Sequence, residues 1–142
     1  MSLTLLAPLI AAGLLGSAAL ALQMQRGRQA QLIGRVIDPA APAASGATQP
    51  AVLYFTGAAC TICHTAQTPA LARLADDLGG SALIREVDVA DKPDLARRYR
   101  VMSLPTTVVL AADGTVAAVN VGFASADRIR DQLTAAGLRA AA

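Results

Sequence analysis

The feature that most constrains this chain is an uncharged apolar run close to its N-terminus. Residues 3–22 contain no charged side chain and few polar ones. A helix needs about 20 apolar residues to cross the hydrocarbon core of a membrane, and a helix without a polar face does not suit the surface of a soluble domain. We therefore predict that residues 1–25 form a single transmembrane anchor. That leaves room for one compact domain in a chain of 142 residues.

A cleaved signal peptide is the alternative for this run. Ala19-Leu20-Ala21 has the small-x-small pattern of a cleavage site. However, no Lys or Arg precedes the run, and the run is longer than the apolar core of a typical signal peptide. These two features favour an uncleaved anchor.

The charges beside the run predict its orientation. Arg26, Arg28 and Arg35 follow it, and only the N-terminal amine precedes it. Because the cytoplasmic flanks of membrane spans are enriched in basic residues, this asymmetry places the C-terminal domain in the cytoplasm, as part of a single-pass protein of the cell membrane. A cleaved or inverted segment would place the domain on the extracytoplasmic side.

A linker separates the apolar run from the rest of the chain. Residues 38–50 are rich in Pro, Ala, Ser and Gly, a composition typical of linkers. We interpret residues 26–50 as a basic flank followed by a flexible linker, and residues 51–138 as the folded domain. Beyond residue 50 basic and acidic residues are equal in number, and only 3% of the chain is aromatic, so the domain lacks the electrostatic footprint of a nucleic-acid-binding protein.

Short apolar runs alternate with helical patterns in the domain. Strands are expected at residues 51–56, 82–89, 106–111 and 115–121. Helices are expected at residues 60–78, 91–98 and 125–136. The helix between the first two strands makes them parallel, and Asp113-Gly114 joins the last two as an antiparallel hairpin. The predicted fold class is an α/β sandwich of order β-α-β-α-β-β-α with a four-stranded mixed sheet.

Capping residues and one proline mark the helix boundaries. Gly79-Gly80 is expected to end the first helix, and Pro69 is expected to kink it. Asp91 is expected to cap the second helix and Ser125 the third. Each of these residues has a local physical reason to sit where the helical pattern begins, bends or stops.

The two cysteines of the chain lie in one Cys-x-x-Cys sequence. Cys60 and Cys63 come directly after a predicted strand, at the start of a predicted helix. Free N–H groups and the positive end of the helix dipole favour the thiolate over the thiol at this position. The i, i+3 spacing puts both sulfurs on one helical turn. Cys60, at the exposed end, is therefore the predicted nucleophile, and Cys63 is the predicted resolving thiol.

A proline motif stands before the third predicted strand. A proline is tolerated at a strand entrance because it has no N–H to donate to the sheet. A cis bond between Leu104 and Pro105 would also turn the chain sharply toward the dithiol and leave the Leu104 backbone free to pair with an extended partner segment. A trans proline that only begins the strand is the alternative, which the Cys-x-x-Cys sequence disfavours.

These motifs carry a resemblance to a known family. Residues 51–133 resemble the thioredoxin family in the order of their elements and in three sequences. The first is CTIC after the strand VLYF, the second is the proline loop SLPTTVVL, and the third is the hairpin ADGTVAAVNVGF. The resemblance covers most of the chain behind the linker.

The resemblance implies a function and a set of site residues. It implies thiol–disulfide exchange, in which Cys60 attacks a partner disulfide and Cys63 resolves the mixed disulfide. It also implies that Leu104 and Pro105 hold the substrate chain, and that Gly122 lets a partner approach the dithiol.

Several positions depart from the family pattern. The family's tryptophan before the first cysteine is Ala59 here, and its Gly-Pro between the cysteines is Thr61-Ile62. Its buried acid, which relays protons to the resolving thiol, is Tyr54, and the lysine near that acid corresponds to Glu86. One hypothesis is that Glu86 supplies the missing acid from the neighbouring strand. The family's first strand and helix are also missing from the pattern, and the linker stands in their place.

His64 raises a haem or metal alternative. Cys60-x-x-Cys63-His64 is also the attachment signature of c-type haem, for which Met102 is a conceivable second axial ligand. A zinc or copper site at these three residues would lack the fourth protein ligand of a closed structural zinc site. Otherwise His64 is a solvated residue of the first helical turn. There its protonated form would stabilise a nearby thiolate, and the side chain could take part in proton relay.

The sequence therefore predicts a membrane-tethered thiol–disulfide oxidoreductase acting on protein disulfides, with the Cys60–Cys63 disulfide as its redox group and no further cofactor. Its partners would be protein thiols and disulfides, together with the membrane that residues 3–22 enter. A thioredoxin-fold binding module with little turnover is the second hypothesis. A haem or metal carrier is the third.

Overall fold

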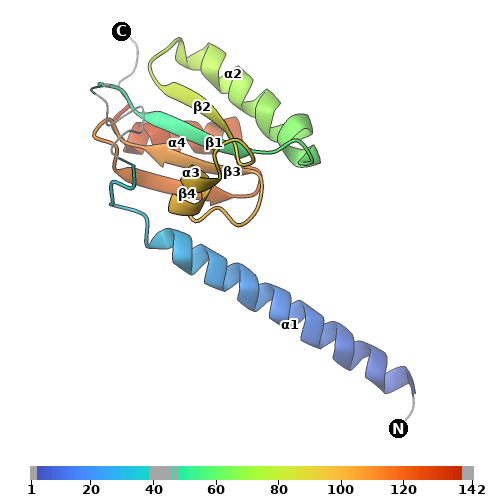
Figure 1. The fold of residues 1–142 in the computed structure, drawn as a ribbon. Helices are drawn as coiled ribbons and strands as arrows, with labels where there is room; N and C mark the ends of the chain where they lie inside the picture. The colour runs from blue at the N-terminus through green and yellow to red at the C-terminus, as the bar shows by residue number, and fades with distance from the viewer. Residues whose placement is uncertain (1–2, 39–45, 47, 139–142) are drawn as a thin grey trace.

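The computed structural model describes residues 3–38, 46 and 48–138, and side chains from Leu6 onward. Part of the predicted linker, residues 39–45 and 47, lies outside the described residues. The described chain consists of a long helix, α1, and a domain built on one sheet (Figure 1).

The sheet has four strands in the spatial order β2-β1-β3-β4. The strands are β1 (Ala51–Thr56), β2 (Leu83–Asp88), β3 (Thr106–Leu110) and β4 (Val116–Val121). β1 and β2 are parallel, and β3 runs antiparallel to both β1 and β4. The predicted mixed sheet and the element order β-α-β-α-β-β-α are confirmed.

Helices cover both faces of the sheet. They are η1 (Cys63–Gln67), α2 (Thr68–Leu78), α3 (Pro93–Arg98) and α4 (Ala126–Ala135). α2 and α4 contribute Leu71, Leu74, Ile129 and Leu133 to one buried cluster, which also contains Cys63. We call the side of the sheet under α2 and α4 the site face. The other side, the opposite face, has a separate buried cluster to which the α3 region contributes Ala96 and Tyr99.

Strand β1 lies at the centre of the domain, and all of its residues are buried. Side chains alternate along a strand, so Val52 and Tyr54 enter the site-face cluster while Leu53 and Phe55 enter the opposite-face cluster. An apolar run without polar alternation is what a strand covered on both sides requires.

The first helix of the domain widens instead of simply kinking at Pro69. Before that proline the chain forms a five-residue π-helical turn, Cys63–Gln67, in which the Thr68 N–H donates to the Cys63 carbonyl. A proline inside a helix lacks an N–H and crowds the preceding turn, and a wider turn relieves both effects. The helix ends where predicted, because Gly79 takes a left-handed conformation at its C-cap.

The predicted caps of the later helices differ in outcome. Ser125 caps α4, since its hydroxyl accepts from the Arg128 N–H at 3.2 Å. The prediction that Asp91 caps α3 is wrong, because α3 begins at Pro93 and the N-cap residue Lys92 makes no side-chain cap. Asp88 instead uses its carboxylate locally, accepting from the Ala90 N–H at 2.8 Å.

The domain takes in chain that precedes its predicted start. Leu32 is buried in the opposite-face cluster, although the sequence prediction assigned residues 26–50 to the flank and linker. Val36 forms a bridge with Thr115, and Val116 exchanges backbone hydrogen bonds with Gly34 and Arg35. Part of the predicted basic flank therefore extends the domain at the edge of β4.

Helix α1, Leu3–Ala30, projects from the domain (Figure 1). The most apolar window of 18 residues within its segment Leu6–Ala30 has a mean hydropathy of 1.7, and none of that window is buried inside the protein. By length and composition this helix suits a membrane span, and a signal sequence near the N-terminus has the same properties.

Candidate functional site

The dithiol lies where β1 passes into the first helix. The chain leaves β1 at Thr56 and turns through Gly57, whose carbonyl accepts from the Cys60 N–H at 3.0 Å. Cys60 and Cys63 form a disulfide with an S–S distance of 2.12 Å and a Cα–Cα distance of 5.3 Å. The strand and the turn thus deliver both sulfurs to the N-terminal end of the helix.

The two sulfurs differ in their access to solvent. Cys63 has an exposed fraction of 0% and belongs to the site-face cluster, whereas Cys60 is half-buried at the surface. The Cys63 N–H donates to the Cys60 sulfur at 3.2 Å. A donor at this position stabilises a thiolate on Cys60 once the disulfide is reduced. The geometry therefore suits Cys60 as the attacking sulfur and Cys63 as the resolving one.

The proline loop meets the dithiol turn at the same edge of the sheet. In the antiparallel pairing of β1 with β3, Phe55 lies opposite Thr106, so the residues just beyond them, Gly57 and Leu104, come together. A Cβ atom added at Gly57 would lie 3.0 Å from Cδ1 of Leu104. The predicted cis bond between Leu104 and Pro105 is present.

The backbone around the proline loop is partly open. Pro105 accepts from the Gly122 N–H at 2.8 Å, which continues the pairing of β3 with β4 by one step. Among the described residues, no backbone hydrogen bond outside the helices and strands involves Leu104. Gly122 has a φ of 82°, and a Cβ added there would meet no atom within 4 Å of the described protein. Open space at Gly122 and an unpaired Leu104 backbone suit the approach of an extended chain.

Tyr54 fills the position of the family's buried acid. Its side chain is 2% exposed, and its hydroxyl lies 3.1 Å from the Thr68 hydroxyl. Glu86 is the register partner of Tyr54 on β2, so both side chains lie on the site face, but Glu86 is exposed. The hypothesis that Glu86 relays protons to Cys63 stays a prediction.

His64 lies on the exposed side of the first turn. Its Nε2 atom is 3.2 Å from the Ala58 carbonyl oxygen. Within the described part of the chain, no three His, Cys, Asp or Glu side chains gather as a metal site. The roles predicted for His64, and the prediction that no cofactor is needed, stay predictions.

A buried glutamine that was not predicted from the sequence supports the site. Gln67 is fully buried on η1; its amide nitrogen donates to the Ala124 carbonyl at 3.0 Å, and its amide oxygen accepts from the Ala124 N–H at 2.9 Å. These bonds tie the dithiol helix to the loop that carries Gly122. A signal was present, because Gln67 is a polar residue four positions from both Cys63 and Leu71 on an otherwise apolar helix stripe.

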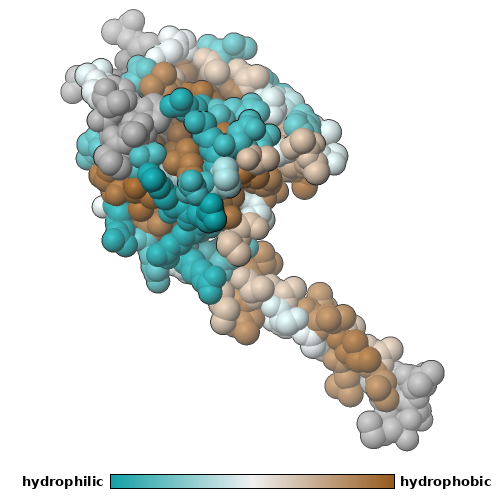
Figure 2. Space-filling view, in the orientation of Figure 1, coloured by the Kyte–Doolittle hydropathy of each residue, from teal (hydrophilic) through white to brown (hydrophobic). Residues whose placement is uncertain are grey.

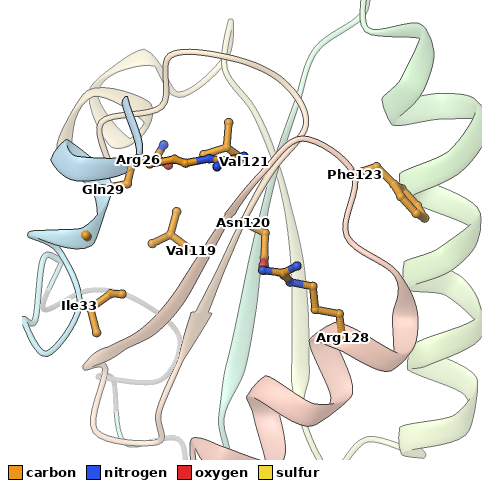
Figure 3. A pocket seen from close by; sticks show the side chains of 9 residues that line it. Arg26, Gln29, Ile33, Val119, Asn120, Val121, Phe123 and Arg128 are labelled. Atoms are coloured by element: carbon orange, nitrogen blue, oxygen red, sulfur yellow. The ribbon is translucent and has the colours of Figure 1, made fainter. Parts of the chain in front are cut away.

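A hollow of about 500 Å³ lies beside the site, between the end of α1 and β4 (Figure 3). Arg26 borders it from α1 and Arg128 from α4, and Phe123 lies at its far side. Arg128 donates through Nε to the Asn120 side-chain oxygen at 3.0 Å. Asn120 is itself fixed by paired amide hydrogen bonds with Gln132. This hollow places two guanidinium groups where the long helix joins the domain.

Known proteins match the part of the chain that carries this site. Residues 43–135 match the thioredoxin family model. Thioredoxin from Staphylococcus epidermidis is 38% identical over 65 residues, covering 46% of this chain and 62% of that protein. Thioredoxin from Staphylococcus aureus shows the same identity and coverage. The chain therefore spans less than two thirds of the length of these relatives.

Solved structures match the domain as well. A structure of a malarial protein aligns with a TM-score of 0.58 and 27% identity, covering 63% of this chain and 98% of that one. Thioredoxin-2, a component of malaria parasite protein secretion machinery, aligns with a TM-score of 0.57 and 28% identity over 61% of this chain and 82% of that one. Chloroplastic thioredoxin z has a TM-score of 0.56 at 23% identity, covering 63% and 79%, and shows the shared fold alone.

The family match spans well over half of the chain and includes the dithiol turn, the proline loop and the β3–β4 hairpin. The sheet order and the disulfide at the head of a helix agree with that match. This protein belongs to the thioredoxin family.

Proposed function

We propose that this protein is a membrane-tethered thiol–disulfide oxidoreductase that exchanges disulfides with protein partners. The observation that supports this most is the pairing of one reachable sulfur with one sealed sulfur beside the proline loop. A partner disulfide can reach Cys60, whereas Cys63 can react only with a sulfur already bound to Cys60. The Cys60–Cys63 disulfide is itself the redox group, so the proposed chemistry needs no added cofactor.

In the reducing direction, the cycle begins with both cysteines reduced. The Cys60 thiolate attacks a partner disulfide, so one S–S bond forms as another breaks and one partner sulfur leaves as a thiolate. Cys63 then attacks the Cys60 sulfur, which restores the Cys60–Cys63 disulfide and releases the second partner thiol. Two electrons pass to the partner, and a second dithiol must reduce the pair before the next cycle. The oxidising direction reverses these steps.

Insulin reduction by the full chain in detergent, with dithiothreitol as the second dithiol, tests the activity. We expect the protein to accelerate insulin precipitation, and Cys60→Ser to lower its rate by at least about 100-fold because the covalent route is closed. Thr61→Ala, an exposed neighbour, serves as the matched control. A folded protein that gives no acceleration would favour the second candidate, a binding module with little turnover, which the replacement of the buried acid by Tyr54 motivates.

The tether is proposed to be uncleaved α1. The helix passes through the candidate cleavage site Ala19-Leu20-Ala21 without a break and continues to Ala30, and Gln29 in its last turn is buried against the domain. Mass spectrometry of the protein extracted from membranes tests this, since cleavage after Ala21 would remove the N-terminal segment.

Arg26, Arg28 and Arg35 favour a cytoplasmic domain. A membrane-impermeant thiol reagent should then label reduced Cys60 only after permeabilisation, and labelling of intact cells would place the domain outside.

Glu86 and His64 are proposed to assist proton transfer at the dithiol. Glu86 lies on the same face of the sheet as Tyr54, and His64 directly follows Cys63. We expect Glu86→Gln to change the titration of the Cys63 thiol, measured in the reduced protein, and an unchanged titration would refute the relay. His64→Gln provides the same comparison for the histidine.

A further inference from the structure

Hydrogen bonds join the tether helix directly to the loop that precedes the cis proline. The Gln25 amide of α1 donates to the Ser103 hydroxyl at 3.0 Å. Ser103 is followed at once by Leu104 and Pro105, the residues that we expect to hold a substrate chain. In Figure 1 the C-terminal end of α1 lies beside the domain. The tether and the substrate loop are therefore in contact.

Further contacts fix the domain on the helix. The Arg100 guanidinium donates to the Arg28 carbonyl at 3.1 Å and to the Gln31 side-chain oxygen at 2.9 Å. Gln29 is buried, and Leu32 enters the opposite-face cluster. A domain attached at several points along two helical turns keeps one orientation relative to α1.

The position of Gln25 along α1 gives the depth of this contact. The apolar run ends at Leu22, three residues before Gln25, which corresponds to about 5 Å along a helix. The headgroup layer on each side of a bilayer is about 5–8 Å thick. In a membrane-spanning α1, the contact between Gln25 and Ser103 therefore lies in the headgroup layer.

Arginines line two hollows beside this junction, which suits a location in the headgroup layer. Arg28, Arg97 and Arg100 line a second hollow, together with Met102, which is 69% exposed. Arg26 and Arg128 line the hollow of Figure 3 on another side of the helix. In Figure 2, hydrophilic side chains gather where the apolar helix meets the domain. Guanidinium groups around an exposed apolar side chain suit a layer of phosphate groups above hydrocarbon.

Short contacts connect this layer to the dithiol. Ser103 adjoins Leu104, the Leu104 side chain contacts the Gly57 turn, and the Gly57 carbonyl accepts from Cys60. With neighbouring Cα atoms 3.8 Å apart, this path places Cys60 within about 15 Å of Ser103. The dithiol is held close to the membrane and cannot swing away on a linker.

We propose that the substrates are membrane proteins whose disulfide lies next to their own membrane span, on the side of the bilayer that holds the domain. This inference rests on the proposed oxidoreductase function and names its substrate class. A disulfide far above the bilayer is out of reach of a site fixed at the headgroup layer, whereas a juxtamembrane disulfide diffuses into it within the plane of the membrane. The exchange itself proceeds as described for Cys60 and Cys63.

The test uses the full chain in vesicles of phosphatidylcholine and phosphatidylglycerol, with dithiothreitol as electron source. One substrate is a single-span peptide with a disulfide loop directly after its span. A second carries the same loop beyond a rigid helical spacer of 20 residues, which adds about 30 Å. We expect the first to be reduced at least tenfold faster than the second, and equal rates would overturn the proposal.

A shifted variant provides the matched control. Seven helix-forming residues inserted between Leu22 and Gln23 raise the domain by about 10 Å and nearly preserve its rotation, while every contact from Gln25 onward is kept. We expect the preference for the juxtamembrane loop to fall at least threefold while insulin reduction is unchanged. An unchanged preference would contradict a site held at a fixed depth.

A measurement without turnover separates this inference from the proposed function. In Cys63→Ser the remaining thiol, Cys60, can carry a donor dye, and energy transfer to acceptor-labelled headgroups reports its distance from the membrane. We expect strong transfer that decreases in the shifted variant. Weak energy transfer in the unshifted protein would contradict the proposed location of the dithiol, even if insulin is reduced. Strong energy transfer without insulin reduction would contradict the proposed oxidoreductase function but support the location.

Discussion

The two faces of the sheet each bury one tyrosine, and the two tyrosines differ. On the site face, Tyr54 shares a hydrogen bond with Thr68, a residue close to it in the chain. On the opposite face, the Tyr99 hydroxyl is buried and has no hydrogen-bond partner among the described residues. Its ring packs against Phe55, with 5.7 Å between ring centroids. The buried tyrosine of the site face thus has a hydrogen-bond partner, whereas the buried tyrosine of the opposite face depends on apolar packing.

The faces also differ in where their cover comes from. The helices of the site face follow the sheet strands directly in the sequence and carry their own apolar stripes. The opposite face is closed in part by Leu32, which reaches it from the chain before the linker. This difference teaches that the helices covering the site face come from segments next to its strands, while the opposite face takes part of its cover from the segment that follows the tether helix.

The largest expected effect is on the site face. Leu74 is fully buried between α2 and the sheet. We expect Leu74→Ala to lower the free energy of unfolding by about 3–4 kcal/mol, because it leaves a cavity in a closed cluster. Chemical denaturation measures this, with Arg73→Ala on the exposed side of α2 as the control, at about 0.5 kcal/mol or less. A cost below about 1 kcal/mol for Leu74→Ala would mean that the site face is loosely packed.

The next effect tests whether the opposite face needs the tether segment. Leu32 is 2% exposed, and its neighbour Ile33 is 51% exposed. We expect Leu32→Ala to lower the free energy of unfolding by about 2–3 kcal/mol, and Ile33→Ala by less than about 1 kcal/mol. If Leu32→Ala had an effect as small as that of Ile33→Ala, residues before the linker would not belong to the domain, and the comparison of the two faces would fail.

Removing the hydroxyl of Tyr54 tests whether the hydrogen bond that distinguishes it from Tyr99 stabilises the domain. Tyr54→Phe keeps the ring but loses the hydrogen bond with Thr68. We expect a loss of about 1 kcal/mol in the free energy of unfolding, the usual net value of such a bond. A cycle with Thr68→Ala and the double variant isolates the pair, and additive single effects would indicate that the bond contributes nothing.

The same substitution on the opposite face should have the smallest effect at neutral pH. We expect Tyr99→Phe to change the free energy of unfolding by less than about 0.5 kcal/mol at pH 7, because no partner is lost. Burial, and secondarily the charge of Asp38, raises the pKa of Tyr99 to about 12. The folded protein therefore favours the neutral phenol. The resulting contribution to the free energy of unfolding is fully present below about pH 10 and is lost as the pH rises toward 12. Chemical denaturation of the unsubstituted protein and of Tyr99→Phe across this pH range should show a steeper fall in the free energy of unfolding only when Tyr99 is present. Parallel pH dependences of the two proteins would contradict this prediction.

Much of the fold and site was predictable because the relevant signals are local. The apolar run of β1, the cysteines after it and the glycines that end α2 act within a few residues of where they stand. The cis proline was predictable only in combination with the dithiol. The π-helical turn was not, since Pro69 removes a hydrogen bond without indicating how the chain will compensate. The cap of α3 was misassigned because several polar residues near Pro93 compete for that role.

The sequence alone determined the kind of chemistry and the order of the elements, since a Cys-x-x-Cys between a strand and a helix follows from neighbouring residues. Only the tertiary structure decided which distant residues meet. The bonds from Gln67 to Ala124 and from Gln25 to Ser103 join residues 57 and 78 positions apart. No local propensity encodes such pairs, because they form only when the sheet register and the packing of α1 bring the two segments together. The distance of the dithiol from the membrane depends on contacts of this second kind.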